Sequence, residues 1–149
     1  MNYTDRVTRV EPSATLAVSS LAAELEAEGV DVVDLSVGEP DFETPEHIKA
    51  AGRDAITRGE THYSPSKGIP ELRAAIAEKL AAQGMPYEAE NVMVTPGAKQ
   101  ALFEVVHTLV EDGDEVVLLD PSWVSYAAMA EIAGAELTRV DRSETAFQL

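Results

Sequence analysis

Hydrophobic residues recur at helical spacing in the first part of the chain, whereas short apolar runs alternate with helical patterns in the second. Residues 1–13 are polar and without a clear period, so an extended arm is expected there. The leucines and alanines that follow predict a helix, with Ser13 or Thr15 as its N-cap. Gly29 is expected to end this helix, because glycine readily adopts the left-handed conformation of a helix C-terminus.

The next segment combines one apolar strand with two helices. Residues 31–37 predict a short strand, which a Gly-Glu-Pro-Asp turn follows. Thr44 is the expected cap of a helix in which Pro45 takes the first position, where its missing N–H costs nothing. Residues 63–68 are a loop by composition, and Pro70 opens a second helix with an apolar stripe.

From residue 91 onward, strands and helices alternate regularly. Strands are predicted over residues 92–95, 116–119 and 136–140, and helices over residues 98–110 and from Ser122 or Trp123 to residue 133. Short apolar strands that alternate with helices are typical of a parallel sheet with helices on both faces. The chain is therefore expected to be an α/β protein.

The charge balance is strongly acidic. The sequence has 27 acidic and 11 basic residues, a formal net charge of −16 at pH 7 and a pI near 4.4. Such a surface repels the phosphate backbone, so nucleic acid is not an expected partner. Adaptation to a salt-rich cytoplasm is favoured over general solubility, since acidic residues abound while lysine is scarce.

Two further compositional features exclude classes of protein. The sequence has no cysteine, which excludes disulfides, thiolate metal sites and cysteine nucleophiles. The first twenty residues contain no apolar signal segment, and no apolar run reaches the roughly 18 residues that a membrane span requires. We therefore expect a soluble cytoplasmic protein without membrane contact.

Two turns are candidates for ligand binding. The predicted strand 92–95 runs through a small-residue turn directly into a helix, and such a turn aims backbone N–H groups and the helix dipole at one point, which favours an anion. The segment 120–123 follows the next strand, at the edge where parallel sheets bind ligands. Trp123, the only tryptophan, could stack on a planar ring there or be a core or interface aromatic.

Four motifs in the same order resemble the N-terminal motifs of class I aminotransferases, most closely the aspartate aminotransferases of bacteria and archaea. They are residues 35–45 (LSVGEPDFETP), 61–73 (THYSPSKGIPELR), 95–102 (TPGAKQAL) and 121–126 (PSWVSY). The resemblance implies the fold type I of pyridoxal-phosphate-dependent transferases. It also implies a helical N-terminal arm and small-domain segment over residues 1–45. Residues 46–149 are then the first, incomplete part of the cofactor-binding large domain, with the first βαβαβ units of its sheet.

The resemblance implies a set of cofactor-binding residues. Gly97, Ala98 and Lys99 match the turn that holds the phosphate of pyridoxal 5'-phosphate through its amides. Trp123 matches the aromatic residue that stacks on the pyridine ring and borders the substrate. Tyr63 matches the tyrosine that reaches the cofactor phosphate of the neighbouring subunit, which implies a homodimer with shared sites.

Substrate binding is implied less completely. Gly38 matches the glycine whose backbone approaches the substrate carboxylate, where a side chain would block access. Ser122 departs from the aromatic residue that is frequent at its position. The implied substrates are amino acids and 2-oxo acids, with aspartate and glutamate as the first expectation.

Catalytic residues are not expected within these 149 residues. In the family, the lysine that forms a Schiff base with the cofactor lies beyond residue 149. Lys99 would face the wrong end of the cofactor, and Lys67, although part of a Ser-x-x-Lys sequence, lies in a loop where that motif requires a helix. The three histidines show no spacing for metal ligands, so no metal site is predicted.

Two functions are compatible with these patterns. The first is a portion of an aminotransferase that is inactive alone. The second is a non-catalytic remnant that binds a phosphorylated ligand, or a full-length paralogue through the dimer surface. In the implied fold the strands near residues 94, 118 and 137 lack a continuous sheet, so the isolated chain is expected to be marginal, aggregation-prone or supported by a partner.

Overall fold

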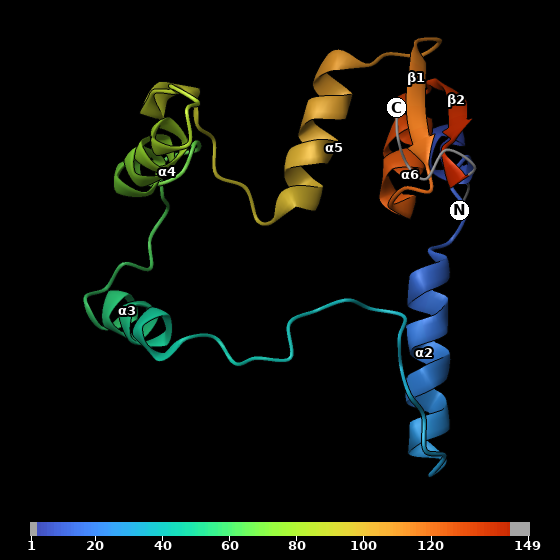
Figure 1. Ribbon diagram of the computed structural model, residues 1–149, viewed down its shortest axis with the longest axis horizontal. Helices are drawn as coiled ribbons and strands as arrows, with labels where there is room; N and C mark the ends of the chain where they lie inside the picture. The colour runs from blue at the N-terminus through green and yellow to red at the C-terminus, as the bar shows by residue number, and fades with distance from the viewer. Residues whose placement is uncertain (1–2, 144–149) are drawn as a thin grey trace. The chain divides into compact units, whose positions relative to one another are not determined.

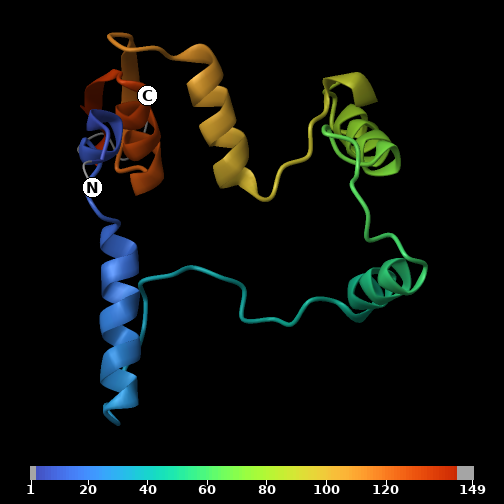
Figure 2. The same cartoon turned by 180° about the vertical axis from the view of Figure 1, so that it is seen from behind.

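The computed structural model describes residues 3–143 and divides into two compact units. One unit contains the residues up to Gly38 together with those from Gly97 onward, and the other is Glu39–Pro96. The elements in chain order (Figures 1 and 2) are α1 (Asp5–Thr8), α2 (Ala14–Ala27), α3 (Glu46–Thr57), α4 (Pro70–Ala82), η1 (Ala89–Asn91), α5 (Ala98–Leu109), β1 (Glu115–Asp120), α6 (Val124–Ala133) and β2 (Glu136–Asp141).

The first unit is built around a β-α-β motif. Strands β1 and β2 pair in parallel, from Glu115 opposite Glu136 to Asp120 opposite Asp141, and α6 connects them (Figure 1). Gly134 ends α6 in the left-handed conformation, with φ 91°, which turns the chain back toward β2. Both strands and both helices predicted beyond residue 97 are thereby confirmed, with ends shifted by one or two residues.

The core of this unit lies where α6 packs on the two strands. Met129 and Ala130 of α6 are buried there, with 4% and 1% of their surface exposed. Helix α5 also packs on α6, as does the short helix α1. The tightest packing in this unit therefore surrounds the helix that follows the 121–123 turn.

The N-terminal segment is partly helical, so the prediction of an extended arm over residues 1–13 was wrong. Residues Asp5–Thr8 form a helical turn, and the Thr8 hydroxyl donates to the Asp5 carbonyl at 3.0 Å. Arg9 then pairs with Asp112 at 3.2 Å, within the same unit. This tertiary contact, which a local pattern does not encode, holds the segment against α6.

Helix α2 begins and ends as predicted. Of the two candidate caps, Ser13 is the one observed, because its hydroxyl accepts from the Leu16 N–H at 3.4 Å. Gly29 has φ 85° directly after the C-cap. The expected strand at 31–37 is absent: this segment has an irregular backbone, because no described strand lies beside it to pair with its N–H and C=O groups.

The second unit contains α3, α4 and η1. Helix α3 begins at Glu46 and Pro45 occupies its N-cap with an extended ψ of 140°, so the prediction of Thr44 as cap was wrong. Pro70 is the first residue of α4, as predicted. The N–H of Val94 donates to the Lys67 carbonyl at 3.0 Å, but residues 92–95 form no strand, so the strand predicted there was wrong.

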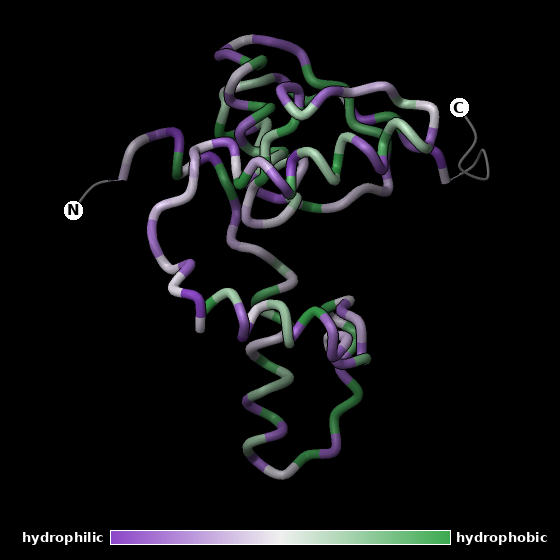
Figure 3. The backbone as a smooth tube through the Cα atoms, turned by 90° about the vertical axis from the view of Figure 1, so that its left-hand side faces the viewer, coloured by the Kyte–Doolittle hydropathy of each residue, from purple (hydrophilic) through white to green (hydrophobic). Residues whose placement is uncertain are grey.

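Few side chains in the described chain are buried. The buried apolar residues are Ala22, Ala77, Met129 and Ala130, and many large hydrophobic residues are exposed. Figure 3 shows hydrophobic segments distributed along the whole trace. None of the helices within residues 3–143 combines the length and apolarity that crossing a membrane requires.

Candidate cofactor site

The N-terminus of α5 is an uncapped helix end preceded by a glycine. Gly97 has φ 85° and ψ 164°, a conformation that side chains with a Cβ rarely adopt, and no side chain caps the helix. The N–H groups of a first helical turn have no intrahelical acceptor, and the dipole places partial positive charge there. Open space surrounds the position where a Cβ of residue 97 would lie. The geometry favours an anion at this turn.

Lys99 and Trp123 lie together beside this turn. The Lys99 Nζ is 4.9 Å from the centroid of the Trp123 ring, which is a cation–π contact. The Tyr126 ring meets the indole edge-on at a centroid distance of 5.5 Å. Trp123 keeps 41% of its surface exposed. One positive side chain and one partly exposed indole thus lie beside the helix end that favours an anion.

Asp120 anchors the turn that carries Trp123. Its Oδ2 accepts from Nη1 of Arg139 at 2.9 Å, and its Oδ1 accepts from the Ser122 hydroxyl at 3.1 Å. The hydrogen bond from Arg139 is the largest cause that holds the pKa of Asp120 below its ordinary value, and Ser122 adds to it. The carboxylate therefore stays ionised and bonded on both oxygens at neutral pH.

The other predicted site residues are not brought to this cluster by any recorded contact. Gly38 ends its segment of the first unit, and open space surrounds the position of its missing Cβ. Tyr63 belongs to the second unit and is fully exposed. Their roles stay predictions, as does the assignment of Gly97, Ala98, Lys99 and Trp123 to a cofactor.

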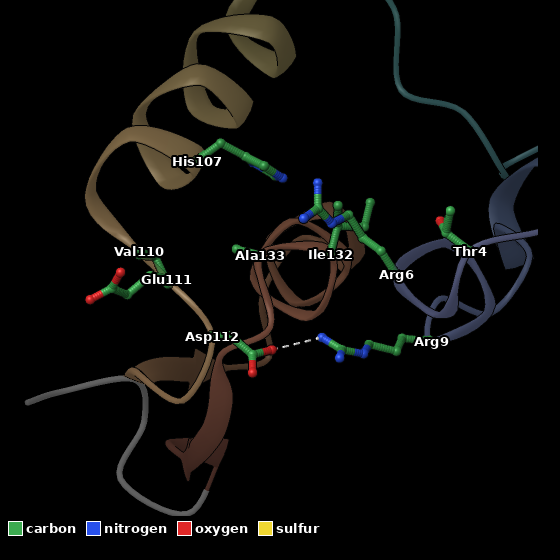
Figure 4. A pocket seen from close by; sticks show the side chains of 9 residues that line it. All are labelled: Thr4, Arg6, Arg9, His107, Val110, Glu111, Asp112, Ile132 and Ala133. Atoms are coloured by element: carbon green, nitrogen blue, oxygen red, sulfur yellow. Dashed lines mark hydrogen bonds and ion pairs between the residues drawn. The ribbon is translucent and has the colours of Figure 1, made fainter.

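A cavity of about 700 Å³ lies at the opposite end of α5 and is not part of this cluster. Figure 4 shows Arg6 and His107 extending into it and the ion pair of Arg9 with Asp112 at its edge. The Nδ1 of His107 lies 3.0 Å from the Phe103 carbonyl, and its buried Nε2 has no partner among the described residues. This polar cavity is therefore separate from the aromatic cluster.

Comparison with known proteins decides the family. A model of the family "Aminotransferase class I and II" matches residues 30–149, most of the chain. The chain belongs to this family. Aminotransferases of class I and II are pyridoxal-phosphate-dependent, so the cofactor class expected from the sequence is confirmed at the level of the family.

Curated relatives of this chain are aspartate aminotransferases. The aspartate/prephenate aminotransferase of Thermus thermophilus is 49% identical over 137 residues, which cover 91% of this chain and 36% of the relative. The aspartate aminotransferase of Geobacillus stearothermophilus is 46% identical over 135 residues, covering 90% of this chain and 34% of the relative. The chain thus spans about a third of the length of these relatives.

Solved structures confirm the fold class. The aspartate aminotransferase from Thermus thermophilus with maleate matches 95% of this chain and 37% of its own, with a TM-score of 0.91 and 47% identity. The aspartate aminotransferase from Rhizobium meliloti matches all of this chain and 38% of its own, with a TM-score of 0.91 and 38% identity. Over the part that it spans, the chain has the aspartate aminotransferase fold, type I among pyridoxal-phosphate-dependent enzymes.

Two residues that contact Trp123 or its turn, Arg139 and Tyr126, were missed by the sequence analysis. Arg139 lies opposite Leu118 in the parallel pairing, and residue 120 shares a strand face with residue 118, so the pair with Asp120 follows from the register. Tyr126 lies three residues after Trp123, on the same side of a helix start. A predicted register of β1 and β2 would have indicated the first contact.

Proposed function

We propose that this chain is the phosphate- and ring-binding portion of a pyridoxal-phosphate-dependent aminotransferase. The parent reaction moves an amino group between an amino acid and a 2-oxo acid, with aspartate or glutamate as the first expected amino acid. The observation that carries the proposal is the Lys99 Nζ 4.9 Å from the Trp123 ring beside the uncapped start of α5, in a chain of this family.

The residues present fit the phosphate of the cofactor. A phosphate dianion requires several N–H donors and positive charge, and the first turn of α5 offers the amides of Ala98 and Lys99, with the helix dipole behind them. The open space at Gly97 admits an anion close to the backbone. The Lys99 ammonium adds a full charge beside the same turn.

The pyridine ring of the cofactor fits the Trp123 indole. An exposed tryptophan face stacks on a flat heteroaromatic ring and excludes water from that side of it. The bound cofactor supplies the electron sink for the reaction. Gly38, which lacks a side chain, would let the backbone approach a substrate carboxylate, and Tyr63 would reach the phosphate of a neighbouring copy in a homodimer. We further propose residues 1–45 as arm and small-domain segment, and the cytoplasm as location.

The test is binding of pyridoxal 5'-phosphate to the 149-residue chain, measured by equilibrium dialysis. Pyridoxal without phosphate is the matched ligand, and inorganic phosphate is the competitor. We expect the phosphorylated form to bind at least about tenfold more tightly, because charge-assisted hydrogen bonds to phosphate contribute about 1.5 kcal/mol or more. Gly97→Val should weaken this binding, since it closes the cradle and strains the backbone at φ 85°.

The outcome separates the proposal from its rival. If pyridoxal 5'-phosphate and inorganic phosphate bind equally well, and Trp123→Ala changes neither affinity, the chain is a phosphate-binding remnant and the cofactor role is wrong. If Trp123→Ala weakens only the cofactor, the ring-stacking role is supported. We expect no transamination by the chain alone, and activity in this preparation would contradict that part of the proposal.

A further inference from the structure

Trp123 lies in the turn between β1 and α6. Trp123 is the N-cap residue of α6, and no side chain caps this helix. The Trp123 carbonyl accepts from the Tyr126 N–H at 3.0 Å, which fixes the helix side of the turn. The strand side is fixed at Asp120, through the hydrogen bond from Ser122 and the ion pair with Arg139.

Strand β2 and the residue after it contact Asp120 at two places. The backbone carbonyl of Asp120 accepts from the Arg142 N–H at 2.9 Å, and its carboxylate accepts from the Arg139 guanidinium at the same distance. Asp120 is the better shielded partner, with 27% of its side chain exposed against 51% for Arg139. Since β2 pairs with β1 in parallel, Arg139 reaches the carboxylate from the adjacent strand.

The expected effect on global stability is small. Partly exposed ion pairs contribute little to the free energy of unfolding, because side-chain entropy and solvent screening offset the attraction. The effect on the orientation of the turn is expected to be larger. Both carboxylate oxygens of Asp120 are hydrogen-bonded, which restricts the rotation of this side chain and holds Ser122, the residue before Trp123. The consequence of this network is therefore local.

We propose that Arg139 is a positioning residue, which fixes the Trp123 indole through Asp120 and Ser122 without touching the cofactor. The proposal rests on the proposed role of Trp123 in stacking on the cofactor ring. It assigns to β2 a part in shaping the site, although no β2 residue contacts the Trp123 ring in any recorded interaction of residues 3–143.

Trp123 itself reports on the proposal, because it is the only tryptophan of the chain. The variants are Arg139→Gln, which removes the charge, and Arg139→Lys, which restores it. Arg58→Gln is the matched control, since Arg58 forms an ion pair of 2.9 Å with Glu60 in the other unit and its side chain is 59% exposed, close to the 51% of Arg139. Far-UV circular dichroism checks that each variant keeps the helix content of the parent chain.

Three fluorescence readouts measure the turn. We expect Arg139→Gln to lower the residual anisotropy of Trp123 and to raise acrylamide quenching by up to about twofold, as an indole now 41% exposed becomes mobile. The acid transition of the emission should move to higher pH, because Arg139 holds the pKa of Asp120 low. Arg139→Lys should restore part of each change, and Arg58→Gln should alter none.

The result that overturns the proposal is an Arg139→Gln chain with native helix content and unchanged anisotropy, quenching and pH profile. Equal changes in Arg58→Gln would also overturn it, since they would reflect general loosening. Failure of the proposed function is distinguishable: a looser indole with unchanged pyridoxal 5'-phosphate affinity supports positioning by Arg139 but removes Trp123 from the cofactor site. A looser indole with several-fold weaker affinity supports both.

Discussion

Hydrogen bonds between near neighbours set the charge state of individual aspartates in this chain. The Ser36 hydroxyl and the Ser36 N–H both bond to Asp34 and hold the pKa of its carboxyl below the ordinary value. The Ser36 hydroxyl also lies 2.7 Å from the Ser19 hydroxyl of α2, which ties the irregular segment to that helix. A folded-state pKa below the unfolded one stabilises the folded chain above the unfolded pKa, and this contribution is lost as the pH falls through the lowered value.

The first prediction concerns this group. Ser36→Ala should raise the pKa of Asp34 toward its ordinary value, because the largest of its stabilising hydrogen bonds is removed and only that from the backbone stays. Carbon-13 NMR titration of the Asp34 carboxyl measures it. Ser19→Ala is the control, since it removes the hydroxyl partner of Ser36 but leaves both bonds to Asp34. A Ser36→Ala chain in which Asp34 titrates as in the parent would contradict the assignment.

Residue identity alone indicated part of the site. Trp123 was a candidate for ring stacking because it follows an apolar strand, with a core or interface role left open, and the small residues at 96–98 indicated an anion-binding turn. Arg139 could not be found this way, since its partner Asp120 is nineteen residues away and depends on strand register. Local sequence patterns indicate which role a single residue can take, whereas contacts between distant residues depend on the register of the paired strands.

At the scale of elements, the predictions succeeded where local patterns suffice. The β1-α6-β2 motif and α5 were predicted because each brings its own hydrogen-bond partners within a short stretch of chain. The strands expected at 31–37 and 92–95 were wrong, because a strand requires a neighbour and none lies beside these segments among residues 3–143. Helical periodicity is a local property, whereas strand pairing is not.

The second prediction tests the contact that holds the 63–68 loop against residue 94. Gly68 has φ 96°, and a Cβ there would lie 2.8 Å from the Val94 side chain. Gly68→Ala should cost about 1–3 kcal/mol through backbone strain and crowding, which corresponds to about a five- to 150-fold faster exchange of the Val94 amide. This amide donates to Lys67 and is followed by NMR hydrogen exchange.

The matched control for this prediction is Gly52→Ala. Gly52 lies inside α3 with open space at its missing Cβ. Alanine should stabilise that helix by about 0.5–1 kcal/mol, because glycine loses more backbone entropy on folding. The two substitutions add the same methyl group within one unit. Opposite signs of the change in stability would therefore show that the position of the glycine, and not the added methyl group itself, decides the effect. Equal effects at both sites would sink the structural account of Gly68.

At the scale of the whole molecule, charge repulsion opposes compaction. The formal net charge is −16 at pH 7, and the recorded ion pairs involve only part of the 27 acidic residues. Salt at about 1 M shortens the Debye length from about 8 Å at physiological ionic strength to about 3 Å, so most of this repulsion is screened. The salt adaptation expected from the composition depends on this effect.

The third prediction follows from the same charge. Raising potassium chloride to about 1 M at pH 7 should make the far-UV ellipticity of the helices more negative, because screening favours the compact chain over the expanded one. The control is the same titration near pH 4.4, where the net charge approaches zero and screening has little to act on. A gain of equal size at both pH values would show that charge repulsion is not the cause.

The fourth prediction concerns cooperativity. The buried residues include three alanines and one methionine, so little apolar surface offsets the conformational entropy of ordering. Isolated, the chain should bind a dye such as anilinonaphthalene sulfonate, lose helix content over a broad temperature range and self-associate in sedimentation.

Adding a polypeptide that supplies partner strands for β1 and β2 should sharpen the thermal transition, since burial of the exposed apolar side chains then becomes cooperative. A dye-free monomer that melts sharply by calorimetry would show that the described elements bury enough surface by themselves.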